Sequence, residues 1–271
     1  MKRLNGKTAV VTGGGSGIGR GMCLAFAAEG MSVVVSDIQE DAAEAVAAEV
    51  RETGQKALAV CTDVAKRDSV RELADRSFAE FGTVHVLCNN AGVFTFKNMV
   101  DLTHDDWKWV IGVNLDGVVN GVTQFVPRLI AQGGEAHIVN TSSTAGLYPG
   151  GGVLSYVTAK YAVTGLTEHL RRDLAKIDIG VSLLCPGNVR TQIDHSGRNR
   201  PDELGGPEET PAEFLAARAH RTIPPNEPEE VGEWVVQAIK NNEEFIVMNP
   251  ERRAAVAGRL DALLAAYERA Q

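Results

Sequence analysis

Near the N-terminus stands the stretch Ala9-Val10-Val11-Thr12-Gly13-Gly14-Gly15-Ser16-Gly17-Ile18-Gly19-Arg20, in which a β-branched run passes through glycines into a helical pattern. The glycines do not fit G-x-G-x-x-G. Gly13, Gly17 and Gly19 instead give G-x-x-x-G-x-G. Glycines let the backbone approach a pyrophosphate, and a helix N-terminus offers free N–H groups and a positive dipole end. After a first strand, this turn predicts a dinucleotide site, and a tight turn without a ligand is the alternative. The residues assigned to it are Gly13, Ser16, Gly17, Ile18 and Gly19.

Short apolar runs alternate with helical patterns along almost the whole chain. Most runs are continuously apolar, as in parallel strands covered on both faces. The predicted strands are Thr8–Thr12, Val33–Asp37, Ala57–Cys61, Val84–Asn89, His137–Thr141, Val181–Cys185 and Phe245–Met248. The predicted helices are Gly17–Glu29, Glu40–Thr53, Arg67–Phe81, Thr103–Ala131, Tyr156–Lys176 and Glu229–Asn241. This repetition predicts an α/β fold, a Rossmann-type doubly wound parallel sheet of about seven strands with helices on both faces, as a single domain over residues 1–271.

One segment, residues 190–228, lacks this alternation of apolar runs and helical patterns and is rich in Pro, Gly, Arg and Glu. A segment of this length is usually a functional lid or a disordered loop. We expect a partly helical substrate lid, with a short helix over Pro211–His220. Residues 251–271 are expected to form a C-terminal helical tail.

Composition excludes several classes of protein. Lys and Arg total 27 and Asp and Glu 35, a net charge of −8, which is the opposite of a nucleic-acid footprint. The first residues lead directly into a strand without an apolar signal segment, and no stretch approaches the length of a membrane span. The four separated cysteines suggest free thiols in a reducing, cytoplasmic setting. The six histidines show no metal-binding spacing, so no metal site is expected.

Asp37 ends the second predicted strand, eighteen residues after Gly19. A carboxylate there is placed to accept hydrogen bonds from the ribose 2′- and 3′-hydroxyls of adenosine and would repel a 2′-phosphate. Ile38 follows it, and Ser16 lies in the glycine turn, so neither position offers a cation for that phosphate. These residues favour NAD over NADP, and the alternative is a strand-end aspartate without this role.

Tyr156 and Lys160 stand four residues apart in Ser155-Tyr156-Val157-Thr158-Ala159-Lys160, so on a helix they share one face. An ammonium near a phenol favours the phenolate and lowers a pKa that is ordinarily about 10. The tyrosine could then exchange protons near neutral pH. This spacing also occurs by chance in many helices. The glycine turn and Ser143, thirteen residues upstream, favour the chemical interpretation.

Taken together, these motifs resemble a classical short-chain dehydrogenase/reductase over residues 5–250. The resemblance rests on the order and spacing of Thr12-Gly-x-x-x-Gly-Ile-Gly19, Asn89-Asn90-Ala91-Gly92, Asn114, Ser143, Tyr156-x-x-x-Lys160 and Pro186-Gly187.

The resemblance implies catalytic roles for four residues. Tyr156 would be the general acid/base, and Lys160 would lower its pKa and bind the nicotinamide ribose. Ser143 would hydrogen-bond the substrate oxygen, although its neighbour Ser142 is a rival for this role. Asn114 would hold a water that relays protons to Lys160.

It also implies further contacts to NAD. Asp63 and Val64 follow the third strand, where the family contacts adenine. Asn90, Ala91 and Gly92 would line the adenosine ribose and support the sheet. After the sixth strand comes a proline-glycine turn whose Val189 backbone and Thr191 would hold the carboxamide. The residues of that segment assigned to the cofactor are Pro186, Gly187, Val189 and Thr191.

Substrate contacts are expected from Val93–Phe96, Thr144–Leu154 and the lid. Phe94 and Phe96 suggest an apolar or aromatic substrate face, and ordinary packing beneath a lid is the alternative. The lid arginines (Arg198, Arg200, Arg218 and Arg221) could meet an anionic group or be solvated. The stretch from Trp109 to Arg128 is similar to a branch that acts on bulky aryl secondary alcohols, such as lignin aryl-ether Cα-dehydrogenases.

The expected function is therefore NAD-dependent interconversion of a secondary alcohol and a ketone. A 3-oxoacyl thioester reductase and a non-catalytic NAD-binding protein on the same fold are the alternatives. The resemblance further implies a homo-oligomer, a tetramer or a dimer. Its contacts would come from the predicted helices Thr103–Ala131 and Tyr156–Lys176 and from the strand Phe245–Met248.

Overall fold

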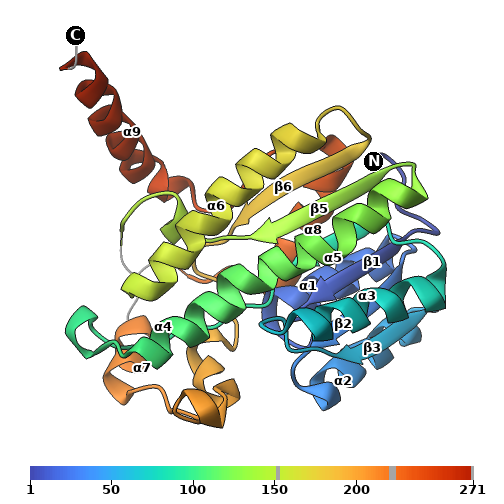
Figure 1. The fold of residues 1–271 in the computed structure, drawn as a ribbon, viewed down its shortest axis with the longest axis horizontal. Coiled ribbons are helices and arrows are strands. Elements are labelled where there is room, and N and C mark those ends of the chain that lie inside the picture. The colour runs from blue at the N-terminus through green and yellow to red at the C-terminus, as the bar shows by residue number, and fades with distance from the viewer. Residues whose placement is uncertain (151–152, 220–223, 270–271) are drawn as a thin grey trace.

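A computed structural model describes residues 1–150, 153–219 and 224–269, and within α7 the side chains up to Ala216. Its centre is one seven-stranded sheet, all parallel, in the order β3-β2-β1-β4-β5-β6-β7 (Figure 1). The strands are β1 (Thr8–Thr12), β2 (Ser32–Asp37), β3 (Ala57–Cys61), β4 (Val86–Asn89), β5 (Ala136–Thr141), β6 (Ile179–Cys185) and β7 (Phe245–Val247). The predicted doubly wound Rossmann-type sheet is confirmed.

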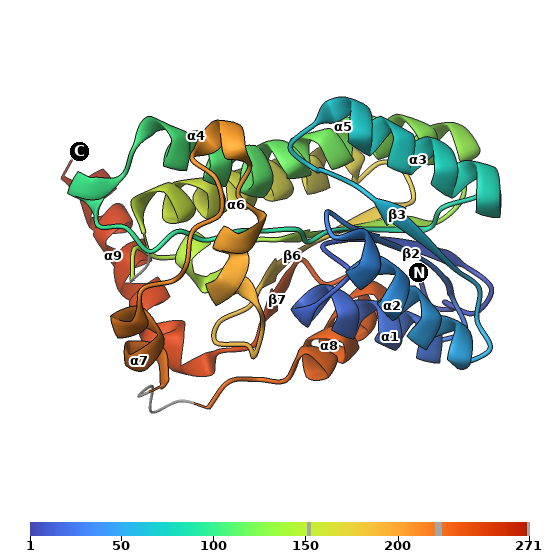
Figure 2. The same ribbon diagram turned by 90° about the horizontal axis from the view of Figure 1, so that it is seen from below.

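Helices cover both faces of the sheet (Figure 2). One face packs against α1 (Gly17–Ala28), α2 (Glu40–Glu52) and α8 (Pro228–Asn241). The other packs against α3 (Arg67–Phe81), α5 (Gly117–Gln132) and α6 (Leu154–Leu174). Burial on both faces is why the central strands read as unbroken apolar runs.

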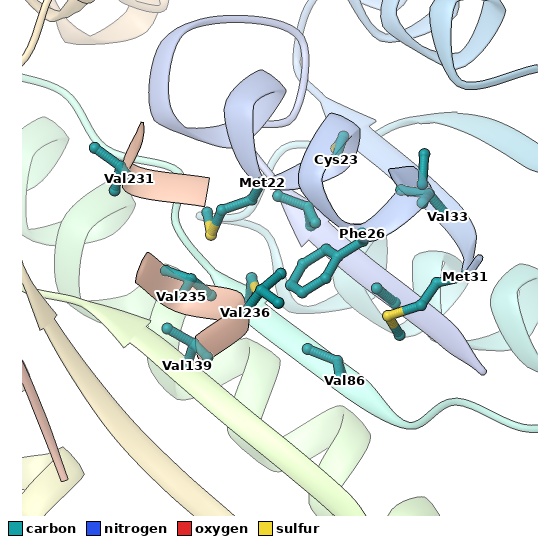
Figure 3. Close-up of a cluster of buried hydrophobic side chains, with 14 of the residues drawn as sticks. Met22, Cys23, Phe26, Met31, Val33, Val86, Val139, Val231, Val235 and Val236 are labelled. Carbon is teal, nitrogen blue, oxygen red and sulfur yellow. The ribbon is translucent and has the colours of Figure 1, made fainter. Parts of the chain in front are cut away.

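The core beneath α1 and α8 shows how closely these helices approach. Phe26 is fully buried between α1, α8 and the sheet, with Val235 and Val236 of α8 nearby (Figure 3). A Cβ on Gly21 would lie 2.0 Å from the carbonyl oxygen of Pro228, and one on Gly232 would lie 2.3 Å from that of Gly21. The two glycines therefore permit contact between helix backbones.

The strand order reverses between β1 and β4, where open α/β sheets form their ligand crevice. The Thr12 hydroxyl accepts hydrogen bonds there from the backbone N–H groups of Asn90 (2.9 Å) and Ala91 (3.2 Å). The Asn90 amide donates back to the Thr12 carbonyl at 3.0 Å. These bonds tie the loops after β1 and β4 together at the crevice.

Two predicted helices differ in detail from the structure. The stretch Thr103–Ala131, predicted as one helix, is α4 (His104–Ile111), a π-helical turn (Gly112–Asp116) and α5. The helix predicted from Tyr156 begins at Leu154, so Tyr156 lies in its first turn.

The segment 190–228, for which the sequence predicts a partly helical lid and which is called the lid below, contains two 3₁₀ segments (Ile193–Asn199 and Asp202–Leu204) and α7 (Ala212–Ala219). The predicted helix Pro211–His220 matches α7, and His220 lies outside the described residues. After β7, the chain forms α9 (Arg253–Glu268), which extends away from the sheet (Figure 1). No helix among the described residues combines the length and apolar character that crossing a bilayer requires.

Candidate active site

A cleft runs along the carboxyl ends of the strands. Fifteen of the residues assigned from sequence line it: Gly13, Ser16, Gly17, Ile18, Asp37, Ile38, Asp63, Val64, Asn90, Ala91, Gly92, Tyr156, Lys160, Pro186 and Thr191. Five others are not among the lining residues: Gly19, Asn114, Ser143, Gly187 and Val189.

The glycine turn is shaped by positive φ angles and by close backbone packing. Gly13 (φ 63°) and Gly17 (φ 49°) adopt left-handed conformations that favour glycine. A Cβ on Gly19 would lie 1.9 Å from the Gly13 carbonyl oxygen, so Gly19 closes the turn from behind. The Ser16 side chain makes no capping hydrogen bond to α1 within the described structure. Because Ser16, Gly17 and Ile18 line the cleft, the uncapped N–H groups at the start of α1 are available to an anion bound there.

Asp37 lies at the end of β2, beside this turn. One carboxylate oxygen accepts a hydrogen bond from the Gly15 N–H and the other from the Gln39 N–H, both at 3.0 Å. Each oxygen keeps a further lone pair for a ribose hydroxyl. Asp63 is held within its own loop, by the Ala65 N–H at 3.1 Å and by Lys66 at 3.2 Å.

Lys160 is buried (3% exposed) beneath Tyr156, and its Nζ lies 5.5 Å from the centre of the Tyr156 ring. The ammonium donates to the Thr141 carbonyl oxygen at 2.9 Å. Burial lowers the pKa of Lys160 from 10.5 to about 8. The helical spacing thus brings a buried cation and a phenol together at the cleft.

The two neighbouring serines have different surroundings. The Ser142 hydroxyl points into α6, donating to the Lys160 carbonyl oxygen (2.9 Å) and lying 3.0 Å from the Thr164 hydroxyl. Ser143 is partly exposed, and its hydroxyl accepts from the Ala145 N–H at 3.1 Å. Ser142 is therefore committed to helix packing, whereas the Ser143 hydroxyl proton has no such acceptor within the described part of the chain.

Asn114 lies within the π-helical turn and is fully buried. Its amide donates to the carbonyl oxygens of Val93 and Val110, both at 2.9 Å, and its Oδ1 has no hydrogen-bond partner among the described residues. A Cβ on Gly92 would lie 2.9 Å from this Oδ1 and 3.6 Å from Lys160 Nζ. The unpaired acceptor and the ammonium thus border the same small space, and a water there would satisfy the buried Oδ1.

The segment that follows β6 also borders the cleft, through Pro186 and Thr191. Val189 forms a parallel bridge with Asn226, in which Arg190 donates to Asn226 and Asn226 to Asn188. The N–H and C=O of Val189 itself therefore point the other way. Thr191 packs against the Gly17 position of the glycine turn, within 3.0 Å of where a Cβ would lie.

An aromatic row extends from Tyr156 at the cleft. The Phe94 ring lies 4.9 Å from Tyr156 and 4.8 Å from Phe96, and the Phe96 ring lies 5.2 Å from Phe214 of α7. Phe94 and Phe96 therefore pack together with Phe214, and both a substrate face and ordinary packing beneath a lid remain consistent with this arrangement.

The lid arginines differ from one another. Arg200 is buried and pairs with Asp106 at 2.6 Å, so the sequence-based alternatives of a solvated or substrate-facing Arg200 are wrong. Arg198 lines the cleft and donates to the Gln39 side chain at 3.2 Å, a contact across 159 residues that sequence reasoning missed. Arg221 and the Arg218 side chain lie outside the described residues.

The arrangement fits NAD. Asp37 offers acceptors for the adenosine ribose, and the start of α1, Lys160 and Thr191 line the same cleft. No group of three His, Cys, Asp or Glu side chains in the described ranges is placed to hold a metal ion.

Comparisons with known proteins agree with this geometry. A family model described as short chain dehydrogenase matches residues 7–202. The chain is 35% identical over 270 residues to a C alpha-dehydrogenase from Sphingobium, covering 97% of this chain and 87% of the relative. It is 36% identical over 203 residues to 3beta-hydroxysteroid dehydrogenase 2 from Eggerthella lenta, covering 74% and 78%.

A solved structure shares the whole fold. It is a short chain dehydrogenase/reductase from Burkholderia phymatum in complex with NAD, with a TM-score of 0.91 and 37% identity. The alignment covers 98% of this chain and 96% of that one.

Proposed function

The chain belongs to the short-chain dehydrogenase/reductase family and is an NAD-dependent oxidoreductase acting on CH–OH groups, and on that basis we propose that it interconverts an apolar or aromatic secondary alcohol and its ketone. The observation that carries this proposal is the buried Lys160 beneath Tyr156, next to the aromatic row that begins at Phe94. The similar Sphingobium protein is named a C alpha-dehydrogenase, which agrees with a dehydrogenase reaction at a carbon centre.

NAD, when bound, accepts or supplies the hydride. Tyr156 takes the proton from the alcohol oxygen, or returns it to the ketone oxygen, as a general acid/base. The ammonium of Lys160 lowers the free energy of the phenolate by Coulomb attraction. Ser143 donates its hydroxyl proton to the substrate oxygen and so stabilises charge that develops there.

Asn114 completes the proton path in this proposal. Its unpaired Oδ1 would hold a water in the space shared with Lys160, through which a proton could pass to solvent. The other cofactor assignments follow the geometry above, with Asp37 at the adenosine ribose and the Val189 backbone and Thr191 at the carboxamide. Asp37 also weighs against the NADPH-linked thioester reductase, because its carboxylate would repel a 2′-phosphate.

The remaining assignments belong to this proposal as well. Residues 1–271 would be a single domain, with 190–228 as the substrate lid, in a cytoplasmic homo-oligomer. Free thiols at Cys23, Cys61, Cys88 and Cys185 suit a reducing compartment. Exposed apolar side chains on α5, α6, α8 and β7 suit subunit contacts; these are Val119, Ile130, Leu154, Trp234, Phe245 and Val247.

The test is a panel of aryl and aliphatic secondary alcohols with NAD⁺, followed by NADH absorbance, on wild type and Tyr156→Phe. We expect the substitution to lower turnover by about 10²–10⁴-fold, because the general acid/base is lost. NADH binding, measured by fluorescence titration, should change by less than about twofold.

Tyr161→Phe is the matched control. Tyr161 lies on the same helix, and its ring contacts Arg259 rather than the cleft. The control should keep wild-type turnover. Unchanged turnover in Tyr156→Phe would remove Tyr156 from the mechanism, and a wild type inactive on every alcohol and ketone would reject the proposed function.

A further inference from the structure

Asp106 is a carboxylate with no exposed surface, placed where the lid meets the loop of residues 93–97. One oxygen accepts from the Thr103 N–H (2.7 Å) and hydroxyl (2.8 Å) at the start of α4. The other accepts from Lys97 (2.9 Å) and from Arg200 of the lid (2.6 Å). Burial would raise the pKa of Asp106, but these hydrogen bonds and the Arg200 charge lower it to about 2. The group is ionised and paired at neutral pH.

Arg200 is the lid's side of this contact. Its Nη1 also lies 2.9 Å from Glu208, its Nε donates to the Leu204 carbonyl oxygen at 2.6 Å, and its guanidinium lies 5.6 Å from the centre of the Trp109 ring. Lys97 completes the ring of charges with a 3.3 Å pair to Glu208. A buried guanidinium with this many fixed partners holds the lid in one place.

A second contact between the lid and the loop 93–97 lies next to Tyr156. The buried Ser196 hydroxyl donates to the Phe94 carbonyl oxygen at 3.0 Å and accepts from the Phe94 N–H at 2.9 Å. Phe94 is thus held by its backbone while its ring packs at 4.9 Å from the Tyr156 ring. Leu204 of the lid joins Trp109 and Tyr156 in one apolar cluster.

We propose that Arg200, Asp106 and Ser196 are positioning residues for the substrate site, which hold lid residues 193–208 against loop 93–97 and thereby set the aromatic wall beside Tyr156. The wall of Phe94, Phe96 and Phe214 then accepts the aryl group of a secondary alcohol by edge-to-face packing. This inference rests on the proposed function, and it concerns the aryl end of the substrate rather than the cofactor.

The test compares Arg200→Met and Ser196→Ala with Arg128→Met. Arg128 has matching chemistry away from the cleft, since it pairs with Asp75 at 2.6 Å and lies 5.9 Å from the Phe78 ring. We expect both lid variants to raise KM for an aryl secondary alcohol by about tenfold, because misplaced positioning groups cost one or two orders of magnitude. KM for a three-carbon secondary alcohol and Kd for NADH should stay within about twofold, because neither needs the wall.

The outcomes separate the two proposals. Equal losses for both alcohols would indicate general damage and overturn the positioning role, as would wild-type KM values in both lid variants. Ser196→Ala keeps the test valid if Arg200→Met does not fold. If wild type turns over no alcohol, backbone amide hydrogen exchange still tests the positioning role. Faster exchange confined to residues 93–97 and 193–208 in the lid variants would support it. Unchanged exchange there would overturn it.

Discussion

Asp37 illustrates how one carboxylate is prepared for a ligand before that ligand arrives. Its two oxygens are fixed by the N–H groups of Gly15 and Gln39, so no side-chain freedom is lost when ribose hydroxyls bind. Asp37→Ala should lower the preference for NAD over NADP about ten- to a hundredfold, the range of one or two hydrogen bonds to a charged group. The measurement is the ratio of kcat/KM for the two cofactors.

Glu40→Ala is the control for Asp37. Glu40 carries the same charge at the start of α2 but does not line the cleft. The control should keep the wild-type cofactor ratio. An equal loss of preference in both variants would assign the selectivity to general charge rather than to the Asp37 contacts.

Lys160 links the active site to stability. Its pKa falls from 10.5 to about 8 on burial, so between these pH values the unfolded chain binds more protons than the folded one. Stability therefore rises with pH across this window, and the cost of the buried charge is fully present below pH 8. Without NAD, wild type should gain up to roughly 3 kcal/mol relative to Lys160→Met over this range. The measurement is the free energy of unfolding from denaturant titrations at several pH values. If this free energy changed with pH in the same way in both proteins, the lowered pKa of Lys160 would be contradicted.

At the scale of single residues, sequence patterns predicted contacts that depend on local spacing and missed those that depend on distant partners. Tyr156 and Lys160 meet because helical geometry fixes a four-residue spacing. The burial of Arg200 depends on Asp106, 94 residues away, and no periodic pattern encodes that pairing. Isolated charges in a Pro- and Gly-rich segment look alike in sequence, whether they are solvated or buried.

At the scale of elements, α1 and α8 cross where two glycines meet. A methyl group at Gly21 would lie 2.0 Å from the Pro228 carbonyl oxygen, so Gly21→Ala must push the helices apart. We expect a loss of about 1–3 kcal/mol in the free energy of unfolding, the usual cost of overpacking. Gly165→Ala in α6 is the control, since nothing lies within 4 Å of its added Cβ. It should gain roughly 0.5–1 kcal/mol from helix propensity. The free energies of unfolding are measured by urea denaturation. If Gly21→Ala and Gly165→Ala changed them equally, close packing at Gly21 would be contradicted.

The elements themselves were largely predictable, because each strand is an apolar run and each helix a periodic one. The π-helical turn at Gly112–Asp116 was not. Its residues fit an ordinary α-helix by periodicity, and the extra residue becomes visible only in the backbone hydrogen bonds, where the Gly117 N–H donates to the Gly112 carbonyl oxygen five residues earlier. π-helical turns often mark functional sites, and this one carries the proposed proton relay.

At the scale of the whole molecule, α9 is only partly covered by the fold of one chain, although Arg259 lies over the Tyr161 ring of α6. None of its residues is buried, and its large apolar side chains follow one face of the helix at Val256, Leu260, Leu263, Leu264 and Tyr267. The first two border a cavity of about 590 Å³ that also contacts Trp234 of α8 and Val247 of the edge strand β7. An isolated helix of this length is marginal in water without a packed face. This continuous apolar surface is where the proposed homo-oligomer would place subunit contacts.

Substitutions on the apolar face of α9 test whether it forms subunit contacts. Replacing Leu263 and Leu264 together by Glu should lower the molar mass measured by size-exclusion chromatography with light scattering, because charged side chains oppose burial of the α9 face. Since both leucines are exposed in the single chain, at 47% and 61%, the fold of each subunit should persist by circular dichroism. Ala262→Glu, on the opposite face of α9, should keep the wild-type mass. A monomeric wild type would reject the oligomer, and an unchanged mass in the double variant would place subunit contacts elsewhere.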